Sequence, residues 1–225
     1  MLNNTKSNKR TVIFDMDGVL ADTEPYHCKA WLRALKEAGI NIDEKYYFNK
    51  VCGNASLISA KMLCEEFGIC NIHPEQIVDR KSFHAHDIIA KKGIKPFPGV
   101  IELIQNLIKS GYQLGLASST AFLVINSLLQ SLGIKHHFSV IHGPEVVENG
   151  KPHPDQYLLT AKILNKDPWD LIVIEDSKSG VISAKRAGAK CIAYLNGHNK
   201  KQDLGLADHI TDSFFKINEK LLDKI

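Results

Sequence analysis

Five short apolar runs, separated by helix-like patterns, constrain the fold of this chain more than any other feature. Residues 98–111 and 119–133 carry apolar side chains at spacings of three and four positions and end at a glycine, which predicts helices. Strands rich in Val, Ile and Leu that alternate with helices predict an α/β fold: a Rossmann-like, mostly parallel sheet with helices on both faces. The runs are TVIFD (11–15), YQLGLAS (112–118), FSVIHG (138–143), DLIVIED (170–176) and KCIAYL (190–195).

The segment between the first two runs is far longer than a single crossover connection needs. Helical patterns fill most of it, and two prolines in the IKPFPG stretch at 94–99 discourage the last of these helices from continuing. We therefore expect an inserted all-α helical cap domain over residues 24–95. Residues 1–23 and 96–225 are then expected to form the α/β catalytic core.

The composition argues against nucleic-acid and membrane partners. The formal net charge is only +3 over 225 residues, and the basic side chains are scattered. Five cysteines, without a C-x-x-C pair, indicate neither a disulfide framework nor a zinc site. The first ten residues are polar and the apolar run after them stops at Asp15, too early for a signal peptide or a membrane span, so we expect a cytoplasmic protein.

Polar residues stand where three of the predicted strands end. Because ligands bind beyond the carboxyl ends of the strands in an open parallel sheet, these residues are expected to converge on one edge. Each of them taken alone could instead be a cap or turn residue. The residues are Asp15 and Asp17, Ser118 and Ser119, and Glu175 and Asp176.

Paired carboxylates at the end of a buried strand repel each other by roughly 1 kcal/mol in water, and by more in a partly dry cleft. A hard divalent cation such as Mg²⁺ relieves that repulsion, and it prefers a few oxygen ligands with water and a phosphate oxygen. With such a cation, Asp15 can attack phosphorus to give an aspartyl-phosphate. Asp17 can protonate the leaving oxygen and later deprotonate water. Gly18 allows the backbone to turn tightly beside the phosphate.

The stretch NGKPHPDQY at 149–157 supplies a candidate cation for a phosphoryl group. Lys151 lies between Gly150 and Pro152, in a loop expected at the same edge of the sheet. The alternative is an ordinary solvated loop lysine.

Four ordered motifs, FDMDGVLADTE, ASS, GKPHPD and IEDSKSG, resemble those of the haloacid dehalogenase superfamily, in its branch of small-molecule phosphatases and β-phosphoglucomutases with a helical cap. The resemblance extends over essentially the whole chain. The dehalogenases that give the superfamily its name lack the second aspartate of the first motif, so the presence of Asp17 favours phosphoryl transfer instead. The resemblance implies Asp15 as nucleophile and metal ligand, Asp17 as acid/base and backbone metal ligand, Ser118 as phosphate donor, Lys151 as the cation that pairs with phosphate, Asp176 as metal ligand, and Glu175 in or just outside the metal shell.

Three side chains of the expected cap are candidates for substrate contact. His27 and Trp31 lie one turn apart, in a pattern similar to that of β-phosphoglucomutases, where the histidine couples cap closure to acid/base chemistry. They could equally be a helix histidine and a core tryptophan. Lys81 falls on an apolar stripe, where it either extends its ammonium to water or points into the cleft.

Two departures distinguish the chain from the mutases it resembles. Mutases carry an arginine where this chain has Ser56, and a lysine after the serine motif where it has Ala121. Without those cations a bisphosphorylated intermediate would be poorly held, so water is the expected acceptor.

We therefore predict a monomeric, Mg²⁺-dependent phosphatase whose partner is a small phosphomonoester, a sugar or sugar-acid phosphate. The alternatives are a β-phosphoglucomutase-type mutase and a binding protein that retains the fold without turnover.

Overall fold

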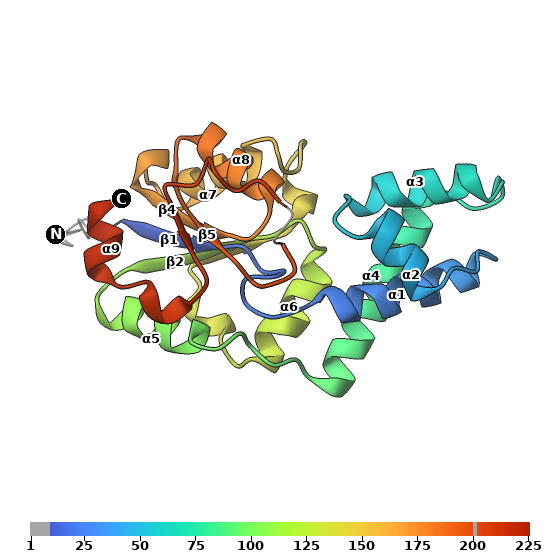
Figure 1. The fold of residues 1–225 in the computed structure, drawn as a ribbon, viewed down its shortest axis with the longest axis horizontal. Coiled ribbons are helices and arrows are strands. Elements are labelled where there is room, and N and C mark those ends of the chain that lie inside the picture. The colour runs from blue at the N-terminus through green and yellow to red at the C-terminus, as the bar shows by residue number, and fades with distance from the viewer. Residues whose placement is uncertain (1–9, 200–201) are drawn as a thin grey trace, which may run out of the picture. The chain divides into compact units, whose positions relative to one another are not determined.

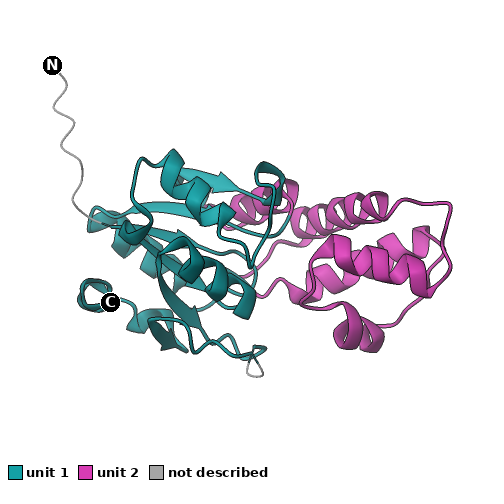
Figure 2. Ribbon diagram, turned by 90° about the horizontal axis from the view of Figure 1, so that it is seen from above, with its two compact units in different colours: residues 1–21, 96–120, 134–225 teal, residues 22–95, 121–133 magenta. Residues whose placement is uncertain are grey.

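The computed structural model describes residues 10–199 and 202–225 (Figure 1). The chain divides into two compact units, coloured separately in Figure 2. Unit 1 comprises Met1–Ala21, Pro96–Thr120 and Ile134–Ile225, and unit 2 comprises Asp22–Lys95 and Ala121–Gly133.

Unit 1 contains a sheet that, within the described residues, has six strands in the order β3-β2-β1-β4-β5-β6, all of them parallel. The central strand β1 is fully buried, with Val12 opposite Leu114 on one side and Ile172 on the other. The predicted α/β fold with a parallel sheet is confirmed. The strands are β1 Thr11–Phe14, β2 Gln113–Ala117, β3 Val140–His142, β4 Leu171–Glu175, β5 Lys190–Tyr194 and β6 His209–Thr211.

Helices cover both faces of this sheet: Figure 1 shows α7 and α8 on one face and α5 on the other. The face under α7 and α8 is packed with apolar side chains, among them Ile13, Val173 and Tyr157. The helices of unit 1 are α5 Val100–Lys109, α7 Asp155–Ile163, α8 Lys178–Ala187 and α9 Glu219–Lys224. Short 3₁₀ turns lie at Lys135–His137, Pro144–Val146, Pro168–Asp170 and Phe214–Lys216.

Unit 2 is helical throughout its regular structure. Its α1 begins with a proline in the first turn, and α4 does so as well. Apolar clusters hold the unit together, one of them around Trp31 and Leu35 of α1. The elements are α1 Glu24–Glu37, α2 Glu44–Tyr46, a π-helical turn at Tyr47–Val51, α3 Ser56–Glu66, α4 Pro74–Lys92 and α6 Phe122–Ser131.

Helix α6 groups with unit 2, although the sequence analysis assigned its residues to the α/β core. Val124 packs with Ala85 and Ile89 of α4, and the Ser131 hydroxyl accepts a hydrogen bond from the Ile94 amide at 3.2 Å. A helix of the α/β segment thus shares a core with the inserted helices. That the inserted helices form a separate cap domain stays a prediction.

In the part of the chain that the structure describes, no helix combines the length and apolarity that crossing a membrane requires.

Candidate active site

A tight turn follows β1 and carries the first pair of carboxylates. The Asp15 amide still donates to the Ile174 carbonyl of β4 at 2.9 Å, which fixes the aspartate at the end of the strand. Gly18 has a φ of 74°, and a Cβ atom there would lie 2.1 Å from Asp176 Oδ2. Glycine is therefore needed twice, for the left-handed backbone and for the close approach of the second carboxylate.

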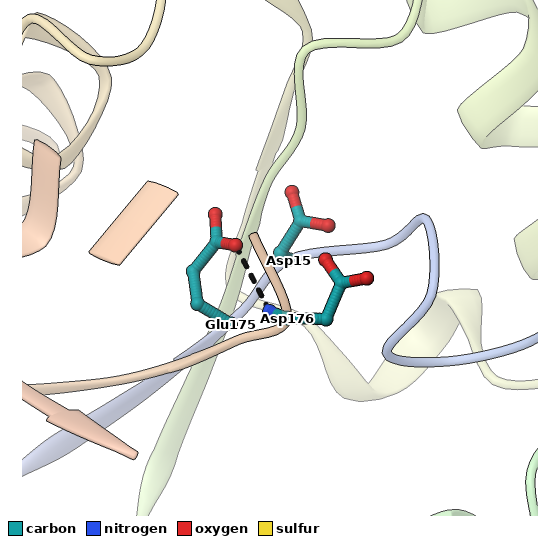
Figure 3. A group of neighbouring side chains, drawn as sticks. All are labelled: Asp15, Glu175 and Asp176. Carbon is teal, nitrogen blue, oxygen red and sulfur yellow. Dashed lines mark hydrogen bonds between the residues drawn. The ribbon is translucent and has the colours of Figure 1, made fainter. Parts of the chain in front are cut away.

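Three carboxylates from two strand ends meet beside this turn. One oxygen each from Asp15, Glu175 and Asp176 can be chosen so that all lie within 4.8 Å of one another. Figure 3 shows Asp15 at the end of β1 facing the pair that ends β4. The strand-end residues of β1 and β4 are thus brought together, as parallel strands require.

Lys151 lies among these carboxylates rather than in solvent. Its Nζ donates to Asp15 Oδ1 at 2.7 Å, to Glu175 Oε1 at 2.6 Å and to the Ala117 carbonyl at 3.1 Å. Only 3% of its side chain is exposed. The alternative interpretation of a solvated loop lysine is therefore wrong.

Hydrogen bonds already engage both oxygens of Glu175. Oε1 accepts from Lys151 and from the Tyr157 hydroxyl, the latter at 2.9 Å. Oε2 accepts from the amides of Asp176 and Ser177 and from the Ser177 hydroxyl, at 3.0 to 3.2 Å. A Cβ atom at Gly180 of α8 would lie 1.8 Å from Oε1, so the carboxylate is also enclosed sterically.

Burial and mutual repulsion control protonation in this cluster. Burial, followed by the charges of Glu175 and Asp17, raises the pKa of Asp15 to about 8 despite the opposing effect of Lys151. Burial, then Glu175 and Asp15, raises the pKa of Asp176 well above its usual range. Burial by itself would lower the pKa of Lys151, but Asp15 and Glu175 raise it well above its usual range. A divalent cation bound beside Asp15 and Asp176 would favour their charged forms and so offset this rise in pKa. The cluster is therefore suited to holding such a cation.

Ser118, at the end of β2, contacts the second aspartate of the turn. Its hydroxyl lies 3.3 Å from Asp17 Oδ2 and accepts from the Thr120 amide at 3.0 Å. Gln156 of α7 donates to the Ser118 carbonyl at 2.7 Å, which fixes the loop. Ser118 is fully buried, whereas the neighbouring Ser119 is exposed.

Three of the residues expected to bind substrate belong to unit 2, whereas the other two, Gly18 and Ser119, belong to unit 1. His27 and Trp31 of α1 and Lys81 of α4 are all buried, with 7%, 3% and 5% of their surface exposed. Trp31 packs in an apolar cluster, in agreement with the alternative prediction that it is a core tryptophan. Their contact with a substrate stays a prediction.

Three residues that were not predicted from the sequence also hold the site: Ser183, Arg186 and Asn196. Ser183 and Arg186 of α8 donate to the carbonyls of His153 and Pro152, which clamps the loop of Lys151. Asn196, two residues after the end of β5, donates to Asp176. The sequence did carry a signal for Asn196, because the rule applied to the other strand ends also applies to the stretch NGHN (196–199) that follows KCIAYL.

Known proteins resemble this chain in sequence and in fold. Residues 12–194 match the family described as haloacid dehalogenase-like hydrolase. The chain is 32% identical to the putative phosphatase YhcW of Bacillus subtilis, over 83% of this chain and 84% of that protein. It is 33% identical to a phosphorylated carbohydrates phosphatase of Thermotoga maritima, over 80% and 82%. The crystal structure of a β-phosphoglucomutase from Clostridium difficile is similar with a TM-score of 0.79 and 27% identity, over 96% of both chains.

Proposed function

Because the chain belongs to the haloacid dehalogenase-like hydrolase family and is a phosphoric monoester hydrolase, we propose that it is an Mg²⁺-dependent phosphatase acting through an aspartyl-phosphate. The observation that carries this proposal is the position of Lys151, which bridges Asp15 and Glu175 beside Asp176. A lysine among three acids suits a site in which a phosphoryl group and a metal ion share the carboxylates. Family membership also favours catalysis over the non-catalytic binding alternative.

In the proposed reaction, an oxygen of Asp15 attacks phosphorus and the bond between phosphorus and the ester oxygen breaks. Asp17 gives a proton to the departing oxygen. It then takes a proton from the water that hydrolyses the aspartyl-phosphate, which releases phosphate and restores Asp15. Lys151 and the Ser118 hydroxyl support the phosphoryl oxygens.

Asp15 and Asp176 are the proposed side-chain ligands of the cation, with the Asp17 backbone carbonyl as a third ligand. A bound Mg²⁺ would neutralise part of the charge that builds up when a phosphate approaches four acidic side chains. Glu175 was included among the candidate ligands. Because its oxygens already accept five hydrogen bonds from described groups, we assign it to holding Lys151 instead.

The proposed substrate is a small sugar or sugar-acid phosphate. The support comes from the relative named for phosphorylated carbohydrates, and from the resemblance of the stretch around His27 and Trp31 to that of sugar-phosphate enzymes. Lys81 is a candidate for pairing with an anionic group of that substrate.

The test is release of inorganic phosphate from a panel of phosphorylated sugars and sugar acids, with and without MgCl₂. We expect turnover that requires the metal and is abolished in Asp15→Asn. Asp223→Asn, an exposed change on α9, is the matched control and should retain activity. A wild-type protein that releases no phosphate from any ester would contradict the proposal.

A phosphosugar mutase is the second candidate, favoured by the similarity to the solved β-phosphoglucomutase. Against it stand Ser56, at the first position of α3, and Ala121, just before α6, where mutases are expected to carry cations. Phosphorus NMR of a reaction with β-glucose 1-phosphate separates the two. Glucose 6-phosphate without free phosphate indicates the mutase, and free phosphate indicates the phosphatase.

A further inference from the structure

Asn196, in the loop after β5, joins two segments of the candidate active site. Its Nδ2 donates to the Gly18 carbonyl at 3.0 Å and to Asp176 Oδ2 at 2.8 Å. Its Oδ1 accepts from the amides of His198 and Asn199, at 3.0 and 3.3 Å. The side-chain amide is thus oriented by its own loop and directs its N–H groups to the turn after β1 and to the acid after β4.

The same loop holds the main chain of Asp176. Asn199 is buried, and its Nδ2 donates to the Asp176 carbonyl at 2.7 Å and to the Tyr194 carbonyl at 2.8 Å. A Cβ atom at Gly18 would lie 2.6 Å from Asn196 Nδ2 as well as 2.1 Å from Asp176 Oδ2. Oδ2 is therefore packed between a bare glycine and an amide donor.

We propose that Asn196 is a positioning residue that fixes the Asp176 carboxylate for the cation and favours Mg²⁺ over Ca²⁺. By holding Oδ2 against the turn, it leaves Oδ1 as the oxygen that Asp176 offers to the ion. This inference rests on the proposed function, because it assumes that Asp15 and Asp176 hold a divalent cation.

The preference for Mg²⁺ follows from the different demands of the two ions. Mg²⁺ requires near-ideal octahedral geometry, whereas Ca²⁺ accepts carboxylates through one or two oxygens in flexible arrangements. A carboxylate with one oxygen fixed offers its other oxygen in a defined direction, which suits the strict geometry of Mg²⁺. The same restraint gives Ca²⁺ no advantage. Hydrogen-bond partners of metal ligands typically contribute roughly 10- to 100-fold to metal affinity.

Calorimetric titration of the purified full-length chain with MgCl₂ and with CaCl₂ tests the proposal without using activity. We expect Asn196→Ala to weaken Mg²⁺ binding by roughly 10- to 100-fold and Ca²⁺ binding by clearly less, so that the ratio of the two affinities falls. Asn106→Ala, the same change at an exposed position of α5, is the matched control and should leave both affinities unchanged. Asn196→Ser, a milder change that is still too short to bridge both partners, replaces the alanine variant if the latter is not recovered folded.

Two results would overturn the inference while leaving the proposed function intact. One is unchanged Mg²⁺ affinity in the folded Asn196 variant. The other is an equal loss for both ions, which indicates that the asparagine only stabilises the loop. Failure of the proposed function itself has a different signature: the wild type then binds no Mg²⁺, or Asp176→Asn binds it as well as the wild type does.

Discussion

Lys151 Nζ lies 2.7 Å from Asp15 Oδ1, a carboxylate oxygen of the proposed nucleophile, and both side chains are buried. Its second partner, Glu175, is 2.6 Å away and has only 1% of its side chain exposed. An incoming phosphoryl group would meet a lysine already held in place by an acid that does not react. The lysine therefore needs little reorganisation to stabilise the charge of the transition state.

Replacing Lys151 by methionine, which keeps the length but removes the charge, should impair both catalysis and folding. Loss of one charge-stabilising donor typically lowers kcat by about 10²- to 10³-fold. In Mg²⁺-free buffer, two buried acids also lose their partner, which typically lowers the free energy of unfolding by about 3 to 5 kcal/mol. Phosphate release and urea denaturation measure the two effects. Lys162→Met, an exposed change on α7, is the control, and a Lys151→Met variant as active as that control would refute the assignment.

Gly180→Ala should destabilise the protein, against the usual sign for such a change. Alanine in place of glycine within a helix ordinarily stabilises by roughly 0.5 to 1 kcal/mol. At this position in α8 the added Cβ would lie 1.8 Å from Glu175 Oε1, and the carboxylate would have to leave Lys151 and Tyr157. We expect a lower melting temperature and a lower kcat. Overpacking of this kind typically lowers the free energy of unfolding by about 1 to 3 kcal/mol. A higher melting temperature would show that Glu175 can move freely.

The ion pair between α1 and α4 in unit 2 should make stability depend on pH in the acid range. Glu37 accepts from Arg80 at 2.7 and 3.0 Å. This bond, with the smaller effect of His84, lowers the pKa of Glu37 from 4.5 to about 2, against the opposing effect of burial. Because the pKa is lower in the folded state, the stabilisation is fully present above pH 4.5 and is lost as the pH falls toward 2.

Thermal unfolding of wild type and Glu37→Gln between pH 7 and pH 2 measures this contribution. The melting temperature of the variant should be lower at neutral pH, and the difference should close below pH 4.5. Arg80→Met should reproduce the pattern, and the double variant should be no worse than either single one, because both remove the same pair. A difference that stays constant down to pH 2 would exclude the ion pair as its cause.

The carboxyl ends of the strands account for most of what was predicted about the site. Asp15, Ser118 and Asp176 each follow an apolar run, and parallel strands bring such ends to one edge whatever the loops do. The position of Lys151 followed from its motif only as an expectation, since a loop lysine carries no periodicity. Asn196 was not predicted, although it too follows an apolar run, because only strand ends that carry Asp, Glu or Ser were interpreted as site residues.

The amino-acid sequence by itself determined the first five strands, their alternation with helices and the convergence of acids at one sheet edge, but not the short edge strand β6. The features that it determined depend on local periodicity and on the direction of parallel strands. Only the tertiary structure decided that Glu175 holds Lys151, that Asn196 fastens Asp176 to Gly18, and that α6 shares a core with α4. These relationships are hydrogen bonds and packing contacts between residues that lie far apart in the chain. Such contacts depend on where the loops and helix faces lie in the folded protein, and no local sequence pattern determines those positions.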